Sequence, residues 1–346
     1  MDLLQWKVVQ VIPEARDAIT YLLELVNGKP VLYEAGQFLT ILIDHHGHEL
    51  RRSYSMSSTP GIDERISITV KRKVNGAISR YIQVLWREGT LFNTIAPTGM
   101  FRIDTDAALQ RTFFFVAAGS GIVPVFSLLK KVLHFEPLSR VVLIYQNYDE
   151  ERIIFHSALQ QLQQEFGKRF VRIDLLSNPK DPHTHPKRLN NSLLEQLILN
   201  TSVPGELRNT FFYTCGPLLF MKMVEFTVRV MGFEGDQIRK ENFTIESVPV
   251  PRFEMEAVPR AVTVHYGKDN FQFTSTYPSS ILQSALDNHI SLPYSCRAGR
   301  CSSCVARCIK GSVKMSVNDV LTEKDLLQGL VLTCVGYAET DVELQF

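Results

Sequence analysis

The chain has 346 residues, of which 45% are hydrophobic and 21% charged, and its formal net charge is +1. This length exceeds one ordinary domain core, so two or three domains are expected. The near-neutral charge predicts no nucleic-acid and no membrane partner. The apolar runs fall far short of the ~20 residues of a membrane span. Because the N-terminus also lacks the pattern of a signal peptide, we expect a cytoplasmic protein.

Residues 1–105 consist of short alternating segments separated by turn residues. The segments at 6–12, 19–26, 37–43, 49–58 and 66–72 predict strands. A short helix is predicted over 79–85, with Ser79 as its cap. This pattern is typical of an antiparallel β-barrel domain.

A polar motif lies on the predicted strand at 49–58, and it consists of Arg52, Ser53, Tyr54 and Ser55. Arginine can clamp a phosphate with two hydrogen bonds, and a tyrosine ring can stack on a planar ligand. Taken alone, the motif is explained equally well as exposed strand polarity. Further along, residues 76–79 open a predicted helix, whose free N–H groups favour a pyrophosphate.

Together with the strand that contains Val70 and Lys71, these features resemble the flavin domain of the ferredoxin–NADP reductase family. The resemblance implies noncovalent FAD, with Arg52 on the pyrophosphate, Tyr54 stacked on the isoalloxazine and Ser55 near flavin N5. It also implies contacts to the ribityl chain and the phosphates from Val70, Lys71, Gly76, Ile78 and Ser79.

Residues 106–245 contain near-continuous apolar runs, at 113–118, 140–147, 170–177 and 210–215, separated by helical stretches. Such runs are typical of parallel strands buried on both faces, so we expect an α/β domain.

Two glycine segments follow strands of this domain. The first contains Gly119, Ser120, Gly121, Ile122 and Pro124. Its glycines allow a backbone to approach a pyrophosphate, and its proline suits a first helical turn. A bare Gly-x-Gly is weak evidence, but the segment resembles the nicotinamide loop of the same reductase family.

The second segment is Cys215, Gly216 and Pro217, at the strand end where open α/β sheets bind ligands. Without the flanking glycine and proline, a packed strand cysteine would be the simpler interpretation. The resemblance implies that Cys215 lies beside the nicotinamide C4 and steers hydride transfer. It also implies that the segment Glu241, Asn242 and Phe243 closes the domain near the flavin, with Phe243 as a site residue.

We expect Asn147 to contact the nucleotide, and the residues that follow it decide between NADH and NADPH. Acidic residues at 149–151 favour a ribose 2′-OH over a 2′-phosphate, so NADH is favoured over NADPH. Arg152 or Arg188 could still bind a phosphate. We interpret the charged run itself as a solvated surface segment.

Residues 246–258 include Pro249 and Pro251 without a helical period, and predict a semi-extended linker. A linker of this kind would let the last domain, residues 259–346, swing between partners. That domain begins with a predicted hairpin at 261–276 and a helix over 280–289.

Four cysteines of the last domain follow the spacing C-x4-C-x2-C…C, and they are Cys296, Cys301, Cys304 and Cys334. This is the plant-type spacing for a [2Fe–2S] cluster. A structural zinc site is the alternative, because Cys-x2-Cys alone fits one. Cys308 lies outside the pattern. The segment resembles plant-type ferredoxins, which implies a β-grasp domain with these four cysteines as ligands.

The motifs, in the order flavin, nicotinamide and iron–sulfur, resemble the reductase components of multicomponent oxygenases, most closely those serving phenylacetyl-CoA epoxidase. The resemblance implies hydride transfer from NAD(P)H to FAD, then single electrons to the cluster and on to an external acceptor protein, an oxygenase component. A stand-alone diaphorase, a reductase for a haem or desaturase partner and a non-enzymatic redox sensor are the alternatives.

Overall fold

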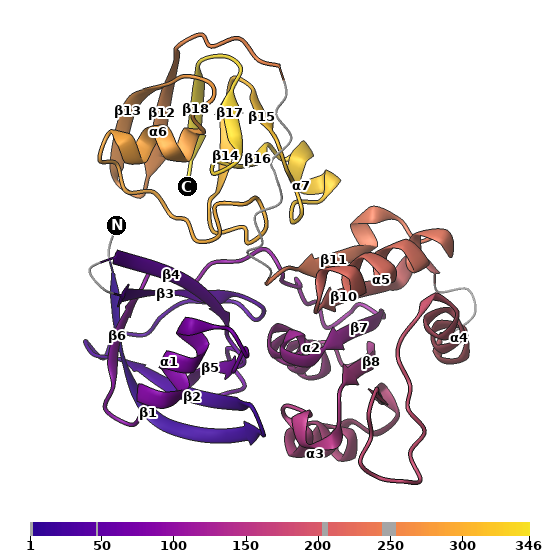
Figure 1. Cartoon of the computed structure of the whole chain (residues 1–346). Coiled ribbons are helices and arrows are strands. Elements are labelled where there is room, and N and C mark those ends of the chain that lie inside the picture. The colour runs from indigo at the N-terminus through magenta and orange to yellow at the C-terminus, as the bar shows by residue number, and fades with distance from the viewer. Residues whose placement is uncertain (1–2, 46–47, 203–206, 244–253) are drawn as a thin grey trace. The chain divides into compact units, whose positions relative to one another are not determined.

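The structure is a computed structural model that describes residues 3–45, 48–202, 207–243 and 254–346 (Figure 1). These residues form two compact units. One comprises Leu3–Pro97 and Phe101–Glu241, and the other contains Thr98–Met100 and the described residues of Asn242–Phe346. Much of the predicted linker, residues 246–253, lies outside the described residues. The predicted domain limits remain predictions.

The first part of the larger unit is a six-stranded antiparallel sheet in the order β4-β3-β6-β1-β2-β5. An isolated bridge between Met56 and Ile68 joins its two outer edges, so the sheet closes on itself. Trp6 and Tyr21 fill the interior, at 1% and 0% exposure. The elements are β1 Leu4–Ala15, β2 Ala18–Leu25, β3 Phe38–His45, β4 His48–Ser55, β5 Ile66–Lys71, α1 Ala77–Leu85 and β6 Leu91–Thr94. The predicted antiparallel barrel is confirmed.

The second part is a five-stranded sheet in the order β11-β10-β7-β8-β9, and all of its pairs are parallel. Its strands alternate between two cores. Phe113 and Phe115 pack with helices α2 and α3, whereas Phe114 packs with α4 and α5 on the opposite face (Figure 1). The strands are β7 Thr112–Ala118, β8 Arg140–Asn147, β9 Phe170–Leu176, β10 Thr210–Cys215 and β11 Ile238–Glu241. The α-helices are α2 Ile122–Phe135, α3 His156–Phe166, α4 Asn191–Thr201 and α5 Leu218–Val230, and the 3-10 turns are Gly119–Gly121, Glu150–Arg152, Gly167–Arg169, Leu207–Asn209 and Gly235–Gln237. The predicted α/β domain is confirmed.

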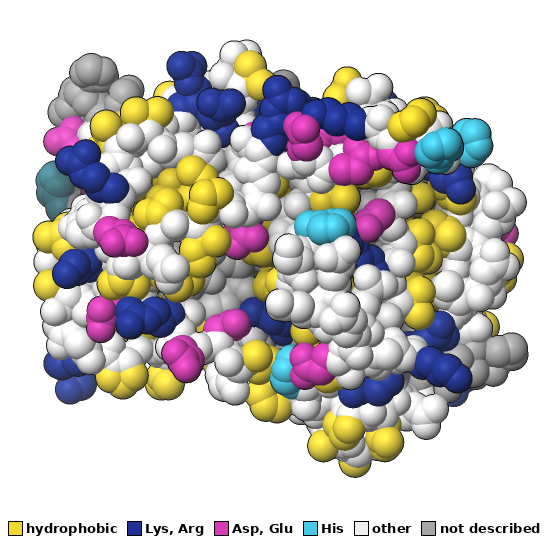
Figure 2. All heavy atoms as spheres, turned by 90° about the horizontal axis from the view of Figure 1, so that it is seen from below, with side chains coloured by type: hydrophobic (Ala, Val, Ile, Leu, Met, Phe, Trp, Pro, Cys, Tyr) yellow, Lys and Arg dark blue, Asp and Glu magenta, His cyan; other side chains and the backbone are white. Residues whose placement is uncertain are grey.

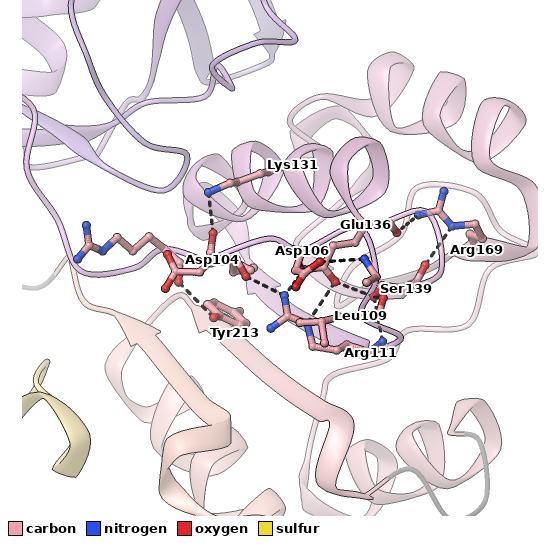
Figure 3. Close-up of polar contacts among 12 residues, drawn as sticks. Asp104, Asp106, Leu109, Arg111, Lys131, Glu136, Ser139, Arg169 and Tyr213 are labelled. Atoms are coloured by element: carbon pink, nitrogen blue, oxygen red, sulfur yellow. Dashed lines mark hydrogen bonds and ion pairs between the residues drawn. The ribbon is translucent and has the colours of Figure 1, made fainter.

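The segment that leads into β7 is anchored on a buried carboxylate, Glu136, just after α2 (Figure 3). Arg111 donates to both of its oxygens, with Nε 3.2 Å from Oε2, and also donates from Nη2 to the carbonyl of Asp104 at 2.8 Å. Ser139 Oγ donates to Glu136 Oε2 at 2.7 Å. Glu136 is 0% exposed, and a buried charge is stable only when it is paired and hydrogen-bonded. This cluster therefore fixes residues 104–111 to the α/β domain.

The smaller unit contains a five-stranded mixed sheet in the order β13-β12-β18-β14-β16 and a two-stranded sheet of β15 and β17. Strand β18 runs parallel to β12 and antiparallel to β14. Helix α6 packs Ile281, Leu282 and Ala285 into the core of this sheet. The elements are β12 Arg260–Tyr266, β13 Asp269–Ser275, α6 Ile281–Asp287, β14 Val305–Lys310, β15 Val313–Met315, α7 Glu323–Leu327, β16 Leu330–Leu332, β17 Gly336–Ala338 and β18 Val342–Gln345. This arrangement agrees with the predicted β-grasp domain.

On the face shown in Figure 2, Lys and Arg side chains are interspersed with Asp and Glu side chains, and hydrophobic side chains lie scattered among them. This mixture agrees with the formal net charge of +1. Among the described residues, the helices are too short or too polar to cross a membrane.

Candidate active site

The flavin motif lies at the end of β4, the edge strand of the barrel sheet. Arg52 and Tyr54 share one face of the strand, since side chains alternate along it. Burial raises the pKa of Tyr54, and the charge of Arg52 partly offsets this effect. The Arg52 guanidinium donates to the carbonyl of Arg51 at 2.7 Å and has no carboxylate partner among the described residues. A cation beside a half-buried ring fits the phosphate and ring system of FAD. On the opposite face, the hydroxyl groups of Ser53 and Thr40 lie 3.0 Å apart.

Helix α1 begins at Ala77, after the N-cap Gly76, two residues before the predicted start. Ser79 is not its cap, because the Ser79 hydroxyl accepts from the N–H of Lys73 at 3.1 Å. Gly76 permits a close approach that a side chain would prevent, since an added Cβ would lie 2.6 Å from Ser79 Oγ. The first-turn N–H groups, including that of Ile78, are the donors that helix starts offer to phosphates.

Strand β5 carries two predicted flavin-binding residues, Val70 and Lys71, and its last residue lies near the nucleotide domain. The Val70 carbonyl accepts from Gln83 Nε2 at 2.8 Å, and the Val70 side chain is fully buried. Lys71 Nζ lies 3.8 Å from the carboxylate of Asp17 and would be 3.3 Å from a Cβ added at Gly119. The Lys71 side chain therefore lies at the glycine turn of the nucleotide domain.

The glycine turn is formed by Gly119–Gly121, between β7 and α2. Gly119 has φ +55°, and Tyr145 Oη donates to its carbonyl at 3.0 Å. A Cβ added at Gly121 would lie 2.0 Å from the carbonyl oxygen of Cys215. Only glycine allows this approach, and it places the two predicted nicotinamide segments against each other. Also around this turn are the half-buried Ser120 and the buried Ile122 and Pro124.

Several buried polar atoms that follow or end the neighbouring strands have no hydrogen-bond partner among the described residues. They include Thr214 Oγ1, before the second glycine segment, both side-chain amide atoms of Asn147, and Asp149 Oδ1, after β8. Buried polar groups normally find partners, so such atoms mark places where a ligand can bond. Asp149 is 2% exposed, so the interpretation of its charged run as solvated is wrong at this residue. Asn147, at the end of β8, is 5% exposed. We call the glycine turn, the second glycine segment and the residues after β8 the nucleotide cradle, and these residues fit a pyridine dinucleotide.

Glu241 links the flavin motif to the second glycine segment. Ser55 Oγ donates to Glu241 Oε2 at 3.1 Å, and Glu241 pairs in register with Cys215 across β11 and β10. All three are buried, at 4%, 8% and 0% exposure. Burial raises the pKa of Glu241 to about 8, so at neutral pH its carboxyl group is largely protonated. Burial, together with Glu241, raises the pKa of Cys215 and keeps it a thiol. This state suits a steering role rather than a nucleophilic one.

Glu241 lies in the segment 241–243 that the resemblance placed near the flavin, but no role was predicted for its side chain. Phe243 is 42% exposed, and its predicted place near the flavin stays a prediction.

The predicted cluster ligands lie together on the smaller unit. The main-chain N–H of Cys296 lies 3.4 Å from Cys301 Sγ, and that of Ala298 lies 3.4 Å from Cys296 Sγ. The thiol of Cys301 lowers the pKa of Cys296, and that of Cys334 lowers the pKa of Cys304.

Interactions between the thiols join Cys301 to Cys296, Cys296 to Cys334 and Cys334 to Cys304, so the four thiols form one connected group. Four thiolates are the ligands of a plant-type [2Fe–2S] cluster, so the residues fit that group. Within the described ranges, no three His, Cys, Asp or Glu side chains gather where they could hold a single metal ion. Cys308 lies apart, with Sγ 3.3 Å from the carbonyl of Lys310.

The loop that carries these ligands is held by unusual backbone conformations. Arg297 and Ser302 adopt φ of 54° and 55°, and Gly299 adopts 69°. Arg300 is 5% exposed, and its Nε lies 3.1 Å from a carboxylate oxygen of Asp319. The loop is thus pinned to the segment that follows β15.

Comparisons with known proteins agree with this geometry. Family models match residues 5–103 as an oxidoreductase FAD-binding domain, 115–225 as an oxidoreductase NAD-binding domain and 265–339 as a 2Fe-2S iron-sulfur cluster binding domain. The chain is 30% identical to a component of the 1,2-phenylacetyl-CoA epoxidase of Escherichia coli, over 98% of this chain and 96% of that protein. It is 32% identical to the ferredoxin reductase component of 3-ketosteroid-9-alpha-monooxygenase from Mycolicibacterium smegmatis, over 98% and 95% of the two chains.

The chain belongs to this family of FAD- and [2Fe–2S]-containing reductases. A solved structure of phthalate dioxygenase reductase shares the reductase's fold with a TM-score of 0.60 at 24% identity, covering 99% of this chain and 98% of the other. The reductase is an NAD(P)H-dependent flavin and iron–sulfur oxidoreductase, as the sequence predicted.

Proposed function

We propose that this reductase passes electrons from NADH to a separate oxygenase component. The names of its relatives support the class of acceptor, since the Escherichia coli relative belongs to a phenylacetyl-CoA epoxidase and the Mycolicibacterium relative to a monooxygenase. An epoxidase acting on an acyl-CoA substrate is the acceptor that we test first.

The observation that carries the hydride step is the contact from Ser55 through Glu241 to Cys215. It links the residue assigned to flavin N5 with the residue assigned to nicotinamide C4. When bound, the flavin supplies both two-electron and one-electron chemistry, which a hydride donor and a one-electron cluster require between them.

The protein's own residues bind and orient the cofactors. Arg52 supplies charge for the pyrophosphate, Tyr54 packs on the ring system, and the N–H groups at the start of α1 bind phosphate oxygens. The neutral Glu241 keeps the Ser55 hydroxyl oriented and leaves no charge at the hydride path. The Gly119–Gly121 turn and the segment Cys215–Pro217 lie against each other and carry no side chains at their glycines, which leaves room for the pyrophosphate of the nucleotide.

The preference for NADH follows from the charges after β8. The guanidinium of Arg152 lies 3.8 Å from Asp149 and 3.9 Å from Asp17, and 4.8 Å from the ring of Tyr148. Lys180 forms an ion pair with Glu151. Because these cations already lie beside carboxylates, they offer less charge to a 2′-phosphate, although Arg152 Nε makes no hydrogen bond within the described residues. Asp149 Oδ1, which has no hydrogen-bond partner there either, can accept from a ribose hydroxyl.

The test combines anaerobic reduction with electron transfer. Purified protein should contain about one FAD and two irons per chain, bleach faster with NADH than with NADPH, and support turnover of a phenylacetyl-CoA epoxidase oxygenase component. A protein that bleaches with NADH yet fails to support any oxygenase, while reducing artificial acceptors, would contradict the proposed partner and favour a stand-alone diaphorase.

A further inference from the structure

The loop that follows the flavin motif is bonded directly to the helix that follows the glycine turn. Ser127 Oγ on α2 donates to the carbonyl of Ser58 at 2.6 Å, and Thr59 Oγ1 donates back to the carbonyl of Ser127 at 2.9 Å. One turn further along α2, Lys130 donates to Asp63 Oδ2, which also accepts from the N–H of Thr59 at 2.6 Å. We name these residues the α2 lock.

Apart from Asp63, whose side chain is 33% exposed, the α2 lock is buried. Ser58, Thr59 and Ser127 are 1%, 0% and 0% exposed, and the side chain of Lys130 is 8% exposed. Burial lowers the pKa of Lys130, whereas the Asp63 charge works against that shift. Removing the Asp63 carboxylate would leave the buried Lys130 ammonium without compensation, so the contact tolerates little displacement.

The lock lies close to both motifs along the chain. Ser58 lies three residues after Ser55 of the flavin motif. Ser127 lies on the second turn of α2, and this helix begins at Ile122, directly after Gly121. At 1.5 Å per residue along a helix, the lock is roughly 9 Å from the glycine turn. Gly121 in turn touches the carbonyl of Cys215, so the whole nucleotide cradle must move with the start of α2.

We infer that the α2 lock is a positioning device for hydride transfer, in which Lys130, Asp63, Thr59 and Ser127 set the approach of the nicotinamide to the flavin motif. The inference rests on the hydride transfer proposed above. In that step NADH gives up the C4 hydrogen with both bond electrons and leaves as NAD⁺, and the flavin receives them. A misplacement of 1 Å can cost about 100-fold in the rate of such a step.

The test measures anaerobic flavin reduction by stopped flow across a range of NADH concentrations. For Lys130→Met we expect the limiting rate to fall about 10- to 100-fold, with the Kd for NADH within about twofold and FAD and iron contents unchanged. Deuterium at NADH C4 should give a larger isotope effect in the variant than in the wild type. The matched control is Lys131→Met on the same helix, whose Nζ bonds the carbonyl of Ile103 at 2.6 Å instead of the loop (Figure 3). Its limiting rate should match the wild type.

A double variant separates positioning from stability. Asp63→Asn alone leaves the buried Lys130 ammonium without its carboxylate, so its thermal midpoint should fall. Adding Lys130→Met removes both charges, so the midpoint should recover relative to Asp63→Asn while reduction stays slow. Recovery of the rate together with stability would overturn the inference, as would a limiting rate for Lys130→Met within about twofold of the wild type. If Lys130→Met does not fold, Thr59→Val decides by the same readouts. A wild type that NADH does not reduce would refute the proposed donor instead, and the same rate ratios would then be measured with NADPH.

Discussion

The cluster loop and the hydride site are built in opposite ways. Three of the four cluster ligands lie on one loop, from Cys296 to Cys304, and their geometry depends on local left-handed residues. The hydride site joins Ser55 to a partner 186 residues away, through two sheets of different domains. A local site can be predicted from residue spacing, and one substitution in it should abolish binding of its cofactor. In a dispersed site, each substitution should change one property, such as FAD affinity, and leave the others intact.

The largest effect is expected in the cluster loop. Cys334→Ser removes one ligand of the four, so most of the iron should be lost while about one FAD per chain is retained. Iron and flavin analysis of the purified variant measures both. Cys308→Ser, on the adjacent strand, is the control and should keep its iron. Full iron in Cys334→Ser would contradict the assigned ligation.

The next effect concerns a single cofactor of the dispersed site. Arg52→Ala removes charge-assisted hydrogen bonds to the pyrophosphate, so the affinity for FAD should fall about 10- to 100-fold, with iron unchanged. Fluorescence titration of the flavin-free protein with FAD measures this affinity. The control is Arg51→Ala, which changes the opposite face of the same strand. Equal FAD affinities for Arg52→Ala and wild type would rule out the clamp.

A smaller effect is expected in how the stability of the protein depends on pH, because the dispersed site contains the buried Glu241. Folded Glu241 keeps its proton up to about pH 8, whereas an unfolded chain releases it near 4.5, so folding takes up a proton in this window. The free energy of unfolding should therefore fall as pH rises from about 5 to 8, by an amount on the order of a few kcal/mol. Glu241→Gln should lack this component and gain stability relative to wild type at pH 8. Thermal midpoints across the range measure it, and parallel curves would contradict the raised pKa.

The smallest effect concerns the choice of donor. Asp149→Asn should reduce the ratio of kcat/KM for NADH over NADPH about 3- to 10-fold, since one hydrogen bond to a charged group is weakened. Steady-state assays with both nucleotides measure the ratio. Glu150→Gln, whose carboxylate instead accepts from the N–H of Lys180 at 2.9 Å, should leave it unchanged.

How much the sequence could predict follows the same division. The cysteine spacing, the apolar runs of the parallel sheet and the Gly119 turn are local patterns, and each was found where it was expected. The start of α1 was misplaced, because Ser79 bonds Lys73 from within the helix rather than capping it. The predicted strand at 49–58 ends at Ser55, since Met56 changes its pairing to Ile68 of β5 and the carbonyl of Ser58 accepts from α2. Strand β6 was missed because it has four residues and only two are buried.

Longer-range features could not be predicted in this way. Glu241 reaches Ser55 only because β11 lies beside β10 in the sheet, an order that no local pattern encodes. Asp149 stands in a charged run that is typical of solvated surface, yet the fold buries it. The α2 lock depends on two domains meeting, and its residues carry no motif.

The buried Glu136 anchor has a consequence for engineering chimeric reductases. Because Arg111 and the N–H of Asp106 both donate to Glu136, residues 104–111 are held by the α/β domain and contribute to its stability. A grafted nucleotide module that starts at β7 would leave Glu136 without its guanidinium inside an apolar interior. The exchange point should therefore precede Asp104, so that the donor protein's own connecting peptide is transferred together with the carboxylate that it neutralises.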